Sequence, residues 1–107
     1  MLTYKTKAIR NEFGQLTPIM QLFVYGLAAL FWVISGKTQV VTALIAGGHD
    51  PNGLHPLGRA VDLRSKHLSN WAKQRCLSAA KGVIGLFGGV AILEASGTDN
   101  EHFHIQV

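Results

Sequence analysis

Four of the five histidines lie in two short segments of the chain. His49 and His55 belong to a glycine-rich stretch in the middle, and His102 and His104 stand close together near the last residue. Neutral imidazole and carboxylate are good zinc ligands, and a catalytic zinc site keeps three protein ligands with a fourth position open for water. The clustering therefore predicts a zinc site.

Two motifs give this prediction a definite form. The segment from His55 to Asp62, HPLGRAVD, has the pattern H-x-x-G-x-A-x-D, and residues 101–104, EHFH, have the pattern E-H-x-H. Together they resemble the zinc D-alanyl-D-alanine peptidases and their relatives, which include vancomycin-resistance dipeptidases, phage endolysin peptidases and the Hedgehog signalling domain. The resemblance covers about residues 41–107 and is closest to small phage-type members.

The resemblance implies a role for each residue of the two motifs. His55, Asp62 and His104 would bind Zn²⁺, and Glu101 would be the general base that takes a proton from the metal-bound water. His102 would lie beside the metal and help to stabilise the transition state. In a regular strand, however, Glu101 points away from the His104 side, so the base role requires an irregular turn before His102.

The residues that bind the substrate are less well defined by the sequence. His49 is a candidate because phage-type relatives often carry a histidine there, and Arg59 and Arg64 are candidates because a guanidinium binds a carboxylate through two hydrogen bonds. Each has the alternative of an ordinary solvated side chain. Gly53 stands where many relatives have serine, and residues 46–48 lack the arginine of those relatives, which puts the recognition of a C-terminal carboxylate in doubt.

The hydrophobic pattern predicts one α+β domain over residues 1–107. Thr17 and Pro18 fit a helix start, and the last strand alternates, with aromatic and aliphatic residues on one side and His102, His104 and Gln106 on the other. We expect a small antiparallel sheet that carries the zinc site and packs against two helices, as in the Hedgehog-type peptidases. One expected helix is 18–35, and a second is capped by Ser69 and runs to about Gly82 or Leu86. The expected strands are 39–45, 60–64, 90–95 and 102–107.

The segment Ile19–Gly36 has no charged side chain and approaches the length needed to cross a bilayer. Polar residues within it favour a buried core helix, so membrane association is not expected. No signal peptide is evident, and we expect the chain to stay in the host cytoplasm until lysis or to be virion-associated. The net charge of +4 is spread without a run, which argues against nucleic acid as a partner, and the single Cys76 reads as a buried thiol.

The sequence thus predicts a monomeric zinc metallopeptidase that acts on peptidoglycan stem peptides, as a carboxypeptidase or an endopeptidase, in phage lysis or wall processing. Two alternatives stay open. One is a zinc-binding domain without catalysis, and the other is a membrane-anchored lysis accessory protein built on residues 19–36.

Overall fold

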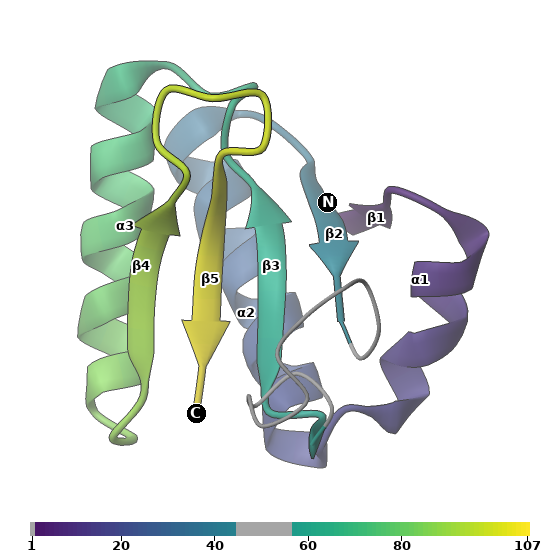
Figure 1. Cartoon of the computed structure of the whole chain (residues 1–107). Coiled ribbons are helices and arrows are strands. Elements are labelled where there is room, and N and C mark those ends of the chain that lie inside the picture. Colours follow the sequence, from purple (N-terminus) through teal and green to yellow (C-terminus); the bar gives the residue numbers. More distant parts are fainter. Residues whose placement is uncertain (1, 45–56) are drawn as a thin grey trace.

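A five-stranded mixed sheet with two long helices behind it forms the body of the protein (Figure 1). The computed structural model describes residues 2–44 and 57–107, and the strand order is β1-β2-β3-β5-β4. The strands are β1 (Leu2–Tyr4), β2 (Gln39–Ala43), β3 (Ala60–Arg64), β4 (Val90–Glu94) and β5 (His102–Gln106). The helices are α1 (Lys7–Glu12), α2 (Pro18–Ser35) and α3 (Asn70–Gly85), with a 3-10 turn at Phe13–Gln15.

Both long helices begin at the residues that the sequence indicates. The Thr17 hydroxyl accepts a hydrogen bond from the Met20 N–H at the start of α2, and the Ser69 hydroxyl does the same for the Ala72 N–H at the start of α3. Such caps satisfy N–H groups that have no partner within the helix. α2 ends at Gly36, whose φ of 69° is left-handed. The two predicted helices are confirmed.

The α+β class is confirmed, but two details of the prediction are wrong. The first dozen residues form β1 and α1, so there are three helices rather than two. β1 runs parallel to β2, which makes the sheet mixed rather than antiparallel. A three-residue strand and a helix without buried residues leave no hydrophobic period in the sequence, which explains why they were not predicted.

The alternation of β5 separates a core face from an outer face of the sheet. Phe103 and Ile105 are fully buried, and the Phe103 ring lies 5.4 Å from the Phe31 ring of α2. Burying a side chain of this size contributes about 2–3 kcal/mol. His102 and His104 therefore lie on the outer face, which we define as the face of the sheet opposite to α2 and α3.

α2 is both a core helix and an apolar surface. Its buried side chains are Met20, Phe23, Val24, Leu27, Ala28 and Phe31. The other side exposes Leu22, Tyr25 and Val33. Among the described helices α2 alone is long and apolar enough to cross a membrane, and a third of it is buried in the protein. Its six buried side chains agree with the interpretation as a core helix.

Gly58, which belongs to the segment His55–Asp62, packs against the residues just before α2. Its φ is +71°, and a Cβ there would lie 2.5 Å from the carbonyl oxygen of Gln15. Its own carbonyl accepts a hydrogen bond from the Thr17 N–H at 3.0 Å. We predict that Gly58→Ala lowers the free energy of unfolding by about 2–4 kcal/mol, because a left-handed backbone and a steric clash act together.

Urea denaturation checks this, with Gly26→Ala as the matched control. Gly26 lies within α2 with open space around it, so alanine there is expected to stabilise by up to about 1 kcal/mol. Equal effects of the two substitutions would contradict the close packing at Gly58.

Candidate metal-binding site

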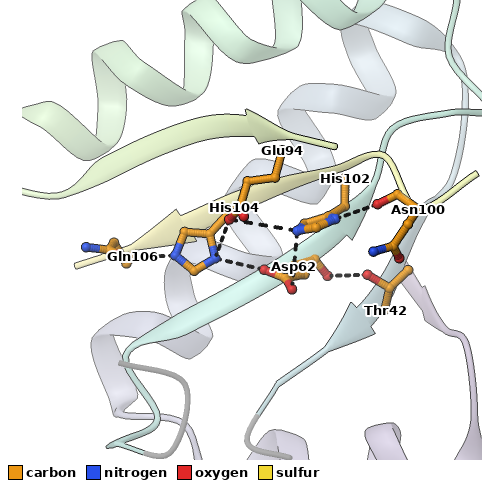
Figure 2. A network of polar contacts seen from close by, with 7 residues as sticks. All are labelled: Thr42, Asp62, Glu94, Asn100, His102, His104 and Gln106. Carbon is orange, nitrogen blue, oxygen red and sulfur yellow. Dashed lines mark hydrogen bonds and ion pairs between the residues drawn. The ribbon is translucent and has the colours of Figure 1, made fainter. Parts of the chain in front are cut away.

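Two of the predicted zinc ligands lie side by side on the outer face. Asp62 of β3 and His104 of β5 are register partners in the antiparallel pair, although 42 residues separate them in the sequence. The Asp62 Oδ1 and His104 Nδ1 atoms are 2.9 Å apart, as Figure 2 shows. Sheet register alone therefore brings a carboxylate and an imidazole to one place.

A second imidazole and a second carboxylate border this pair. The His102 Nε2 atom is 3.6 Å from Asp62 Oδ2 and 3.9 Å from Glu94 Oε1. Glu94 Oε1 is also 3.5 Å from His104 Nδ1. The His102 Nδ1 atom lies 2.7 Å from the Asn100 carbonyl and donates its proton there, so a neutral His102 turns an unprotonated Nε2 toward the two carboxylates. Figure 2 shows the whole network on one side of the sheet.

The ring of His104 is fixed from both sides. Its Nε2–H donates to the Gln106 side-chain oxygen at 2.8 Å, which leaves Nδ1 as the atom that can bind a metal. The hydrogen bond to Asp62 raises the pKa of His104 above 6.5, against the opposing effect of burial. Metal binding at Nδ1 would displace the proton that this nitrogen shares with Asp62. Sequence reasoning did not assign Gln106 a role, although its spacing of two from His104 places both on one strand face.

The donor atoms of Asp62 and His104 suit zinc. Tetrahedral zinc with bonds of about 2.0–2.2 Å places neighbouring donor atoms about 3.3 Å apart. His104 Nδ1 and Asp62 Oδ1, which are 2.9 Å apart, would therefore have to move apart only slightly to bind one ion. Within residues 2–44 and 57–107, no group of three or more His, Cys, Asp or Glu side chains is arranged to hold a metal ion. The third predicted ligand, His55, and the candidate His49 lie outside the described residues.

Glu101 is not brought together with Asp62 and His104. Its buried carboxylate points toward α3, where it accepts hydrogen bonds from the Ser65 hydroxyl at 2.7 Å and the Gly97 N–H at 2.9 Å, and it lies 2.7 Å from the Lys73 ammonium. The Gly97 hydrogen bond, followed by Lys73 and Ser65, lowers the pKa of Glu101 to about 2 despite burial. A carboxylate so stabilised in its charged form is a weak base at neutral pH.

The two candidate arginines have different surroundings. Arg59 Nε donates to the main-chain oxygen of Val107 at 2.8 Å. Arg64 is the register partner of His102 and lines a pocket at the end of the polar network. Cys76 is buried as expected, and burial raises the pKa of its thiol to about 11. Only Arg64 of these three residues lies next to the site.

The surroundings of Glu101 predict a definite acid response. Its contribution to stability is complete above pH 4.5, its ordinary pKa, and is lost as the pH falls toward about 2, where the folded form takes up the proton. We predict that Glu101→Gln removes this part of the pH dependence. At neutral pH it lowers the free energy of unfolding by about 2–3 kcal/mol, because Lys73 loses its partner.

Denaturant unfolding between pH 2 and pH 7 measures both effects. Asp99→Asn removes an exposed carboxyl from the same loop and is the matched control, with little change expected. Identical profiles for the two variants would show that Glu101 has no special structural role.

Comparison with family models, with curated proteins and with solved structures finds no match for the chain.

Proposed function

We propose that the protein is a zinc-dependent peptidase that hydrolyses peptide bonds in peptidoglycan stem peptides. The observation that carries the proposal is the contact between Asp62 and His104 at 2.9 Å on the outer face. These are two of the three residues that the two sequence motifs indicate as ligands. The likeness to phage-type peptidases supplies the substrate class, and with it the cell wall as the place of action and a monomer as the working unit.

His55, Asp62 and His104 would hold the ion. When bound, zinc lowers the pKa of a water ligand toward neutrality and polarises the carbonyl of the scissile bond. Gln106 keeps the His104 ring in the tautomer that presents Nδ1, and the Thr42 hydroxyl donates to the Asp62 main-chain carbonyl at 3.3 Å. These contacts hold the ligands in place before the ion binds.

Glu94 is the carboxylate that the geometry favours as proton acceptor. Its side chain is 44% exposed, and its Oε1 lies within 4 Å of both His102 and His104. A base must reach the proton that it removes, and Glu94 is on the same face as the ligands. The resemblance implies Glu101 as the base, and this role stays a prediction. The engagement of its carboxylate by Ser65, Gly97 and Lys73 counts against it. His102 lies beside the proposed zinc ligands, where the resemblance implies a residue that helps to stabilise the transition state.

A zinc-binding domain without catalysis is the second candidate. The observation that favours it is the ion pair of Glu101 with Lys73 at 2.7 Å, which engages the carboxylate that the resemblance implies as the base. This alternative predicts zinc binding without hydrolysis.

The test combines calorimetric zinc titration with digestion of purified peptidoglycan, with products identified by mass. We expect one zinc per chain, loss of binding in His55→Ala and His104→Ala, and unchanged binding in the control His67→Ala, whose imidazole contacts the Thr38 carbonyl elsewhere. Chelation should stop hydrolysis. Zinc binding without any hydrolysis would favour the second candidate, and absence of zinc binding would refute both.

The variants Glu94→Gln and Glu101→Gln show which of the two carboxylates acts as the base. Loss of a general base reduces kcat by about 10²–10⁴-fold. We expect this loss in Glu94→Gln with zinc affinity largely kept, and a stability defect with smaller loss of kcat in Glu101→Gln. The opposite result would return the base role to Glu101.

A further inference from the structure

A pocket with three cationic side chains lies beside the candidate metal site. It is open to solvent, has a volume of about 80 Å³, and is formed by the end of β3 and the residues that follow β1 and precede β5. Its cations are Lys5, Arg64 and Lys66. Figure 2 shows Asn100 and His102, which also line it, at one end of the polar network. The pocket therefore shares His102 with the polar network of the candidate metal site.

The positive charge of this pocket is not neutralised within the described part of the chain. In residues 2–44 and 57–107, Lys5, Arg64 and Lys66 form no ion pair with a carboxylate. Of the two acids at the pocket, Glu101 is paired with Lys73 at 2.7 Å, and Asp99 is exposed. The pocket thus has three cations and, apart from the paired Glu101, one carboxylate, that of Asp99. An anion that enters the pocket would gain charge-assisted hydrogen bonds.

We propose that this pocket binds a carboxylate of the substrate, an inference that rests on the proposed function. Arg64 provides a planar fork that matches a carboxylate, while Lys5 and Lys66 add charge.

The strand geometry sets a scale for the spacing between the pocket and the candidate metal site. Arg64 follows Asp62 by two residues on β3, a separation of roughly 7 Å along the strand. An extended peptide advances about 3.5 Å per residue. This spacing fits a peptide whose free carboxylate lies about two residues from the scissile bond. Arg59, whose Nε is bonded to Val107, has no part in this recognition.

The test uses N-acetyl-Gly-Gly, which has a free carboxylate, its C-terminal amide, and inorganic phosphate as probes. Each is titrated into the zinc-free full chain and followed by ¹H–¹⁵N NMR. We expect N-acetyl-Gly-Gly to shift the amide signals of residues 64–66 and 99–102, and the amide probe to bind at least about tenfold more weakly. Arg64→Gln should weaken binding of the carboxylate about tenfold.

Lys81→Gln is the matched control, because it removes one positive charge from an exposed position of α3. It should leave the affinity nearly unchanged, and Lys66→Gln provides a second pocket variant should Arg64→Gln fail to fold. Equal binding of the acid and the amide, or equal losses in Arg64→Gln and Lys81→Gln, would overturn the proposal. So would tenfold tighter binding of phosphate at these residues.

The result is independent of the zinc proposal because neither metal nor hydrolysis enters the measurement. Carboxylate binding by a chain that binds no zinc would leave the pocket in place and refute the peptidase. Zinc-dependent hydrolysis by a chain that binds no carboxylate would support the peptidase and refute the carboxylate pocket.

Discussion

The register between β3 and β5 is the constraint on which the site depends. It sets Asp62 opposite His104 and Arg64 opposite His102. Because side chains alternate along a strand, a slip by one residue would turn both imidazoles into the core. The apolar residues of the same two strands prevent this slip. Val61, Leu63, Phe103 and Ile105 are fully buried against the helices, so the packing that stabilises the fold also orients the polar residues outward.

A second constraint is the buried carboxylate of Glu101, which ties three parts of the chain together. Ser65 follows β3, Lys73 belongs to α3, and Gly97 lies in the loop that leads to β5. A buried charge is tolerated only when it is paired and hydrogen-bonded, and here all three groups contribute. The loop is thereby held where Asn100 accepts the hydrogen bond of His102, which connects a structural carboxylate to the orientation of a site residue.

Much of the fold follows from local patterns in the sequence. Thr17 and Pro18 mark the start of α2, and the alternation of residues 102–107 places His102 and His104 on one face, as the structure shows. In a regular strand Glu101 points away from the His104 side, and the irregular turn that its role as base requires does not bring it to Asp62 and His104: its carboxylate is buried beside Lys73. The base role came from the resemblance alone. What could not be predicted depends on contacts distant in sequence: no local pattern links Glu101 to Lys73, or Lys5 to Arg64, and β1 is too short to have a period of its own.

The most direct test of the central claim is X-ray diffraction at the zinc absorption edge from crystals grown with Zn²⁺. The zinc proposal predicts one anomalous peak about 2.0–2.2 Å from a carboxylate oxygen of Asp62 and from His104 Nδ1, with the His55 imidazole as third protein ligand. A crystal without such a peak, or with zinc bound only at other residues, would contradict it.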